Sequence, residues 1–397
     1  MTIDFRTAGR DVLAIAIAAI LFVPGTAQAQ GQTYGRVSGS IEQLYDSNLF
    51  AAPENSPFAT PQSDWITRLG PLFEAGYESQ PLNVKVSYGF DAEKYQDLVE
   101  LDDAFARQNA ATSLNYRRQT FAAELTGEFV RTQSPTDLNV ETLRFVGRSP
   151  AQRIASSEAF TFNLSPVTKL TLAHLFNRDS LVGAETSAAN EARVGLARQL
   201  SGRTTVRGDY KLGYTDFSNG REERFHVGTV GLAHALTSML DFEVNGGVRS
   251  TLGDIDPELS AQMRQRMQHG GVAVRYVQTR ETTIGGGASL QVRRVSGEVN
   301  YTPTRAIAFT VTPARASSGG TLSRDVVYIV DIQTKIRATR RWSILALGRA
   351  GQQERSVDRT LPTAANDVIN YRIVSLKTVV TLGALERERE DAETETR

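Results

Sequence analysis

The feature of this sequence that most limits its fold is a two-residue period of hydropathy between Asp325 and Leu347. On a helix the apolar residues of this stretch would be spread around the circumference, whereas on a pleated strand they lie on one face. The first run ends at Arg337, a polar turn covers 338–341, and a second run begins at Trp342. The apolar positions of the first run are Val326, Tyr328, Val330, Ile332 and Ile336. The stretch therefore predicts two strands joined by a tight turn, with one apolar and one polar face.

The same alternation recurs along most of the chain, and the charged residues of the clearest runs all have the polar parity. These residues are Lys85, Glu124, Glu128, Arg207, Asp209, Lys211, Asp241, Glu243, Arg249, Asp331, Lys335 and Arg337. A charge that faces hydrocarbon at mid-depth costs about 2–4 kcal/mol, so a strand between lipid and water requires this parity. We expect these residues to line a water-filled lumen, where they either pair with each other or give a hydrophilic solute a path without a deep trap.

The predicted strands are joined alternately by short turns and by longer loops rich in Pro, Asn, Asp and Ser. This asymmetry is typical of outer-membrane barrels, in which the short turns face the periplasm. Aromatic residues near strand ends, such as Tyr34, Trp65 and Trp342, fit the interfacial girdles of these proteins. Residues 30–385 therefore predict an all-β fold, a transmembrane antiparallel up-and-down barrel of about 18 strands. About 16 strands is the alternative, because the Gly-rich stretch 284–302 fits one strand or two.

The two ends of the chain are predicted to lie outside the barrel. An apolar run from Val12 to Val23 follows Arg6 and Arg10 and precedes small residues up to Ala29, which is the pattern of a signal peptide. We expect residues 1–29 to be cleaved on export, which places the mature protein in the outer membrane of a Gram-negative cell. The charge-rich segment 386–397 predicts a solvated periplasmic tail.

One predicted long loop, residues 252–268, contains the start pattern of a helix. Residues 256–258 suit an N-cap, a proline at the first helical position and an acidic first turn. The apolar residues that follow at four-residue spacing are Leu259, Met263 and Met267. We expect a short helix that is either solvated or folded over the pore mouth, where Arg264 and Arg266 would constrict the path and meet passing anions. With this assignment a short turn falls at 279–281.

The composition gives little support to catalysis, metal binding or nucleic-acid binding. The chain has no cysteine, and none of its four histidines has paired metal-ligand spacing or a Gly-x-Ser-x-Gly motif nearby. His174, His226 and His234 fall within predicted strands, where we expect them in the lumen or at the rim. Lys and Arg total 44, which equals Asp plus Glu, so no excess of positive charge suggests a nucleic-acid partner. We expect no enzyme activity, no catalytic residue, no metal and no other cofactor.

The first predicted strand ends on Tyr45-Asp-Ser-Asn-Leu-Phe50. This motif resembles the stretch that often ends strand one in outer-membrane β-barrel porins associated with exopolysaccharide export. The resemblance implies a porin-like channel for a hydrophilic substrate such as a secreted exopolysaccharide, with Tyr45, Asp46, Asn48 and Phe50 as the family motif. The same residues also fit an Asx turn at Asp46 and Asn48, with Phe50 at the membrane interface.

Two other functions remain open at this point. One is a small-solute diffusion porin, and the other is a soluble exported β-sandwich that binds glycans or builds a surface layer. The expected partners of a porin are outer-membrane lipid, the barrel-assembly machinery and a hydrophilic solute or polysaccharide, and a homo-oligomer is left open. Unitary conductance steps separate a pore from a sandwich, because a sandwich has no lumen.

Overall fold

The computed structural model describes residues 31–54, 59–251, 253–319, 323–357 and 367–382. These residues form 18 strands in one antiparallel sheet, in which each strand pairs with the next and β1 pairs with β18. The first nine strands are β1 (Gln32–Asp46), β2 (Asp64–Glu78), β3 (Leu82–Tyr95), β4 (Asp103–Arg117), β5 (Phe121–Thr132), β6 (Ala151–Ser165), β7 (Thr168–Leu181), β8 (Ser187–Ser201) and β9 (Thr204–Phe217). The other nine are β10 (Glu222–Ala235), β11 (Leu240–Thr251), β12 (Asp254–Met267), β13 (Gly270–Thr282), β14 (Ser289–Thr304), β15 (Ile307–Gly319), β16 (Ser323–Arg337), β17 (Trp342–Val357) and β18 (Asp367–Leu382).

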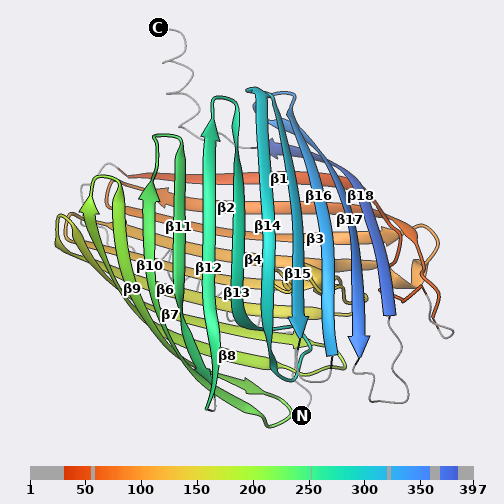
Figure 1. Ribbon diagram of the computed structural model, residues 1–397. Coiled ribbons are helices and arrows are strands. Elements are labelled where there is room, and N and C mark those ends of the chain that lie inside the picture. Colours follow the sequence, from red (N-terminus) through yellow and green to blue (C-terminus); the bar gives the residue numbers. More distant parts are fainter. Residues whose placement is uncertain (1–30, 55–58, 252, 320–322, 358–366, 383–397) are drawn as a thin grey trace, which may run out of the picture.

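The sheet closes on itself, because Val37 to Asp46 of β1 pair with Leu382 to Ile373 of β18. Figure 1 shows the green and blue strands of one wall crossing the orange and yellow strands of the other, as strands tilted to a barrel axis do. The closed ring confirms the predicted antiparallel barrel and its number of strands, and it excludes the two-sheet sandwich. Two short 3-10 turns, η1 (Val99–Leu101) and η2 (Pro135–Leu138), lie in connections between strands.

The division into an apolar and a polar face follows the predicted parity. Directly paired residues of neighbouring strands share a face, so the parity passes from strand to strand around the ring. On β16 the side chains of Tyr328, Val330 and Ile332 point outward and are 41–51% exposed, although they are large and apolar. Asp331 and Lys335 of the same strand point into the lumen. The barrel therefore has a largely apolar surface outside and most of its charges inside.

The connections differ between the two edges of the barrel. Within the described chain, the eight connections on the edge that holds Gln32 and Leu382 have two to four residues each. The opposite edge, called the long-loop edge below, carries the longest connections, 47–63 and 133–150. No helix among the described residues has the length and apolar composition needed to cross a membrane. The predicted signal peptide (1–29) and charged tail (386–397) lie outside the described residues.

The predicted loop helix at 252–268 is wrong. Most of this segment is β12, which pairs along its length with β11 and along its second half with β13. Its apolar residues point outward, and they are Ile255, Leu259, Met263 and Met267. A spacing of four residues satisfies the helical period of 3.6 about as well as the strand period of 2, so the pattern alone did not separate the two.

The two candidate constriction residues therefore lie in a different place from the one predicted. Arg264 and Arg266 lie on β12 close to the short turn at 268–269, away from the long-loop edge, and Arg266 forms an ion pair with Asp241 at 3.4 Å. The short turn predicted at 279–281 lies within β13 instead. These two errors cancel in the number of strands, because one strand replaces the predicted loop and 284–302 contributes one strand rather than two.

Candidate functional site

The segment 133–150 between β5 and β6, called the inner loop below, folds into the barrel. Both of its ends are on the long-loop edge, yet its side chains contact β14, which lies halfway around the ring from β5. Its two legs are joined by the hydroxyl of Thr136, which accepts a hydrogen bond from the Val146 N–H at 2.9 Å and donates to the Val146 carbonyl at 3.1 Å. The inner loop therefore crosses the lumen as a compact unit.

An apolar anchor holds the inner loop against β14 to β18, the side of the barrel opposite β5, which is called the far wall below. Phe145 packs on the inner faces of β15 to β18 against Ala314, Val327, Ile329, Ile369 and Tyr371. Its backbone N–H donates a hydrogen bond to Oε1 of Gln353 at 2.7 Å. Gly351 leaves room for the ring, because a Cβ there would lie 2.5 Å from Cζ of Phe145. Full burial of a phenylalanine side chain stabilises a structure by about 1.5–3 kcal/mol, so Phe145 is a substantial anchor.

Two ion pairs, to β14 and β16, reinforce this contact. Glu141 lies 3.3 Å from Arg294 of β14, which also donates a hydrogen bond to the Val140 carbonyl at 2.7 Å. Arg144 pairs with Asp325 of β16 at 3.0 Å. Burial lowers the pKa of the Arg144 guanidinium, and the Asp325 carboxylate opposes that shift. The inner loop is thus fixed to the far wall by both charges and packing.

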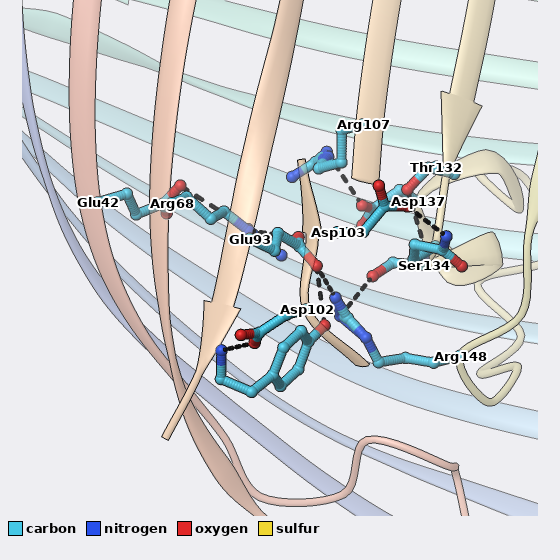
Figure 2. Close-up of polar contacts among 12 residues, drawn as sticks. Glu42, Arg68, Glu93, Asp102, Asp103, Arg107, Thr132, Ser134, Asp137 and Arg148 are labelled. Carbon is cyan, nitrogen blue, oxygen red and sulfur yellow. Dashed lines mark hydrogen bonds and ion pairs between the residues drawn. The ribbon is translucent and has the colours of Figure 1, made fainter. Parts of the chain in front are cut away.

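The near wall holds the inner loop through a buried charge network, which Figure 2 shows. Glu93 of β3 lies between Arg148 of the inner loop and Arg68 of β2, whose Nε is 2.7 Å from the carboxylate. The Tyr95 hydroxyl also donates to Glu93 at 2.8 Å, and Glu42 approaches Arg68 at 3.7 Å. The side chains of Arg68, Glu93 and Arg148 are 8%, 1% and 7% exposed. Removal of one member of such a buried set typically costs about 3–5 kcal/mol, because the remaining charge has no partner.

Asp137 of the inner loop joins the two walls. Its carboxylate is 3.2 Å from Arg107 of β4 and 3.9 Å from Arg349 in the middle of β17. Arg349 is itself held by Asp331, at 2.5 and 3.0 Å to the two carboxylate oxygens. The inner loop therefore reaches about half the height of the barrel.

Two further connections of the long-loop edge meet the inner loop. The backbone N–H of Ile284, in the connection 283–288, donates to Oδ1 of Asn139 at 3.0 Å. Its side chain packs with Leu138 of the inner loop and Ala151 of β6. From the β1–β2 connection, the Leu49 carbonyl accepts a hydrogen bond from the Arg148 N–H at 3.0 Å. Three connections thus narrow the same mouth of the barrel.

A cavity of about 280 Å³ lies between the inner loop and the walls formed by β1, β2, β17 and β18. Charges of both signs line it, with a majority of cations. They are Glu42, Asp46, Arg68, Arg107, Asp137, Arg148, Arg349 and Lys377. We call the inner faces of β1–β4 and β14–β18, which contact the inner loop or this cavity, the packed half of the lumen.

The inner faces of β8–β12 form the open half of the lumen. Among the described residues, the inner loop makes no hydrogen bond or ion pair to these strands. Their charges instead pair along the wall: Arg193 with Asp209 at 2.7 Å, Lys211 with Glu191 at 3.3 Å, and Arg207 with Glu243. Arg207 and Glu243 are 36% and 38% exposed. The open half is therefore a wet wall of mixed charge.

The structure places every predicted lumen residue on the inner face. Besides the pairs already given, Lys85 lies 2.7 Å from Glu74, and Arg249 lies 2.5 Å from Glu258. The residues for which the described part of the chain shows no ion pair are Glu124, Glu128, Lys335 and Arg337. Most of the predicted set lies away from the inner loop, and Asp331 approaches it through Arg349. The sequence reasoning thus found the wall of the lumen and missed the residues that narrow it.

The family motif at the end of β1 forms a structural turn. Oδ1 of Asp46 accepts a hydrogen bond from the Asn48 N–H at 3.0 Å, which is an Asx turn. The Asn48 amide donates to the carbonyls of Ala52 and Asn370 at 2.9 and 3.0 Å and so ties the β1–β2 connection to β18. The Tyr45 ring lies 5.2 Å from that of Trp65, and Phe50 is exposed. The local role of the motif is to fix the rim of the barrel.

The three strand histidines lie on the outward face and not in the lumen, and His234, next to the end of β10, lies at the rim, which was the other expected place. His174 is 2.7 Å from Glu158, and the His226 ring nitrogen is 2.7 Å from the Tyr210 hydroxyl. His234 is 2.9 Å from the Thr204 hydroxyl. Each histidine therefore has a polar partner on the neighbouring strand, which offsets part of the cost of an outward polar side chain.

The comparisons with known proteins give similarity of shape only. No family model and no curated protein matches the sequence. OccAB4 of Acinetobacter baumannii is 9% identical with a TM-score of 0.48, covering 90% of this chain and 100% of that one. The outer membrane protein OpdK of Pseudomonas aeruginosa is 11% identical with a TM-score of 0.46, covering 88% and 99%. The siderophore receptor PirA of the same organism is 7% identical with a TM-score of 0.41, covering 87% and 80%.

Proposed function

We propose that this protein is a porin-like channel of the outer membrane that passes small hydrophilic solutes. The observation that carries this proposal is a closed barrel with an apolar outside and a charged inside. Large apolar side chains are exposed on the outside of both walls, for example Ile41, Leu69, Val230, Met263 and Leu376. A soluble protein rarely exposes contiguous apolar patches above a few hundred Å². Lipid around the barrel removes that cost, and strands of 12 to 16 residues are long enough to cross it.

Passage needs a wet path, and the open half provides one. Rings of 16–18 strands leave an aqueous lumen that side chains do not fill. Arg193, Asp209, Arg207 and Glu243 offer donors and acceptors of both signs along the wall, so a polar solute exchanges partners without meeting one deep trap. The inner loop occupies the other side of the lumen and narrows the mouth to solutes of small size.

Passage of a polymer remains a prediction. Neither the comparisons nor the geometry supports the link to exopolysaccharide export that the Tyr45–Phe50 motif implied. The inner loop argues against passage of a polymer, because Phe145 and the Glu93 network hold it across the lumen in a fixed position. A wide and unobstructed path would suit a polymer better.

Reconstitution of the folded protein in a planar bilayer tests the channel. We expect unitary conductance steps, and we expect liposomes that contain the protein to swell in small sugars and not in dextran. A variant in which a short Gly-Ser linker replaces residues 137–147 should give larger steps, because the linker cannot reach the far wall. Folded protein that inserts and gives no steps, or equal swelling in dextran and small sugars, contradicts the proposal. Fractionation of the native cell envelope checks the membrane assignment independently.

A further inference from the structure

A hollow of about 860 Å³ lies on the outer surface of the barrel, over β13 to β18. Its base is made by the small outward residues Gly297, Pro313 and Ala350. A Cβ at Gly297 would lie 3.3 Å from Cγ of Pro313, and Pro313 pairs with Val330, which in turn pairs with Ala350. Larger apolar side chains bound it, among them Val274, Val295 and Tyr328. The surface is thus hollowed because small residues occupy positions that carry large side chains over most of the outward face.

Two outward arginines line the hollow, Arg315 on β15 and Arg372 on β18. Arg315 of β15 is directly opposite Tyr328 in the sheet, and its guanidinium carbon lies 5.6 Å from the centre of that ring. Arg372 of β18 is opposite Ala350. The amides of Gln352 and Asn370, which pair with each other across β17 and β18, lie in the row of Arg315 and Tyr328, nearer the long-loop edge than the row of Ala350 and Arg372. The row nearer the long-loop edge therefore carries Arg315 and the two amides, and Arg372 is at the β18 end of the apolar row below it.

Both arginines lack a carboxylate partner within the described chain. Most other arginines of the barrel are paired, as Arg349 is with Asp331. The backbone of Arg372 is fixed, because its N–H donates to the Ser47 hydroxyl at 2.8 Å and its carbonyl accepts from the Ser47 N–H at 3.0 Å. A guanidinium presents a planar fork of donors that fits a phosphate. In the headgroup zone, the anion that these two arginines would meet is a lipid phosphate.

We propose that this hollow binds one phosphorylated lipid of the outer leaflet, a glycolipid of the lipid A type. The inference rests on the membrane location proposed above and on long loops that face the cell exterior. A phosphate accepts hydrogen bonds from Arg315 and Arg372, and the Gln352 and Asn370 amides contact the sugar. An acyl chain covers Pro313, Val330 and Ala350 below them. The order of the groups matches a lipid whose head is at the long-loop edge and whose chain points to the middle of the membrane.

Native mass spectrometry of the folded protein, released from detergent and titrated with bisphosphorylated lipid A, tests the site. We expect one bound lipid, and we expect R315Q/R372Q to weaken binding roughly tenfold or more, because glutamine cannot make the charge-assisted hydrogen bonds that arginine makes to a phosphate. Ala350→Phe should also weaken binding by filling the hollow. The matched control is Arg178→Gln on β7, an exposed outward arginine near the same edge that also lacks a carboxylate partner in the described chain. It should bind lipid as the unchanged protein does.

Three results would overturn the inference: equal binding by R315Q/R372Q, equal binding of dephosphorylated lipid A, or equal binding of phosphatidylglycerol. The last result would show a site for any lipid phosphate. Heat-modifiable gel migration confirms that each variant is folded, and bilayer conductance is measured on the same samples. If the unchanged protein conducts normally but shows no lipid selectivity, the lipid site alone is refuted, whereas failure of the unchanged protein to insert or conduct refutes the proposed channel.

Discussion

The two halves of the lumen contain the same kinds of charged residue, but these residues have different roles. In the packed half, Glu93 is shared by Arg68 and Arg148, and all three side chains are almost fully buried. In the open half, Arg207 is shared by Asp209 and Glu243, and more than a third of the Arg207 and Glu243 side chains is exposed. Burial is therefore what distinguishes a charge network that fixes a loop from one that lines a path.

The difference follows from what covers each wall. The inner loop and the cavity beside it remove water from the packed half, so each charge there needs a near partner. In the open half, Arg193, Arg207 and Glu243 are more than a third exposed. Water therefore screens their pairs, which contribute little to stability and are free to exchange partners with a solute. Equivalent substitutions in the two halves should thus have unequal effects.

The largest difference is expected for Glu93→Ala against Glu243→Ala. Glu93→Ala leaves the buried Arg68 and Arg148 without their main partner and should lower the free energy of unfolding by about 3–5 kcal/mol. Glu243→Ala leaves Arg207 with Asp209 and with water, and should cost about 0–1 kcal/mol. Urea unfolding in lipid vesicles measures both. Equal losses for the two variants would remove the distinction between the halves.

A smaller difference is expected for two glycines of β17. Gly351→Ala puts a Cβ 2.5 Å from Phe145 Cζ, so the ring must shift, and the cost should be about 1–3 kcal/mol. Gly348→Ala is the matched control, because a Cβ there meets nothing within 4 Å. Its effect should stay within about 0.5 kcal/mol. Gly351→Ala should also raise the current noise of the open channel, because the inner loop of this variant is less firmly held. If the current noise of the variant is unchanged, Phe145 is not the anchor.

The smallest effect is expected on ion selectivity. Arg207→Gln removes a half-exposed cation from the open half and should shift the reversal potential in a KCl gradient toward cation preference, with unchanged stability. Arg178→Gln on the outer face should leave selectivity unchanged. If Arg207→Gln has no effect on the reversal potential, the conduction path does not follow the open half.

Much of the barrel could be predicted because its information is local. The alternation at Val326–Ile336 determines which side chains face outward, and the polar turn at 338–341 determines where the chain reverses. The prediction failed at 252–268, where Leu259, Met263 and Met267 fit a helix and a strand equally well. Pairing with β11 and β13 settled that ambiguity, and such pairing involves residues outside the segment.

The inner loop left a signal in the sequence that was not used. A loop that simply faces water has no need of Leu138, Leu143, Phe145 and Val146 within so short a segment. These residues indicate that another part of the protein covers the loop, but they do not indicate which part. The partners of Phe145 come from four different strands, and Gly351 gives no hint in the sequence that it makes room for a ring.

The sequence by itself determined most of the strands, their two faces and the cylinder they close, because side-chain parity is a property of each strand alone. Only the tertiary structure decided that one half of the lumen is filled and the other is open. Residues more than a hundred positions apart, such as Phe145 and Gln353, have to meet for the inner loop to fold inward. Burial and packing of that kind arise only when the ring has closed and brought its opposite walls within reach of one loop.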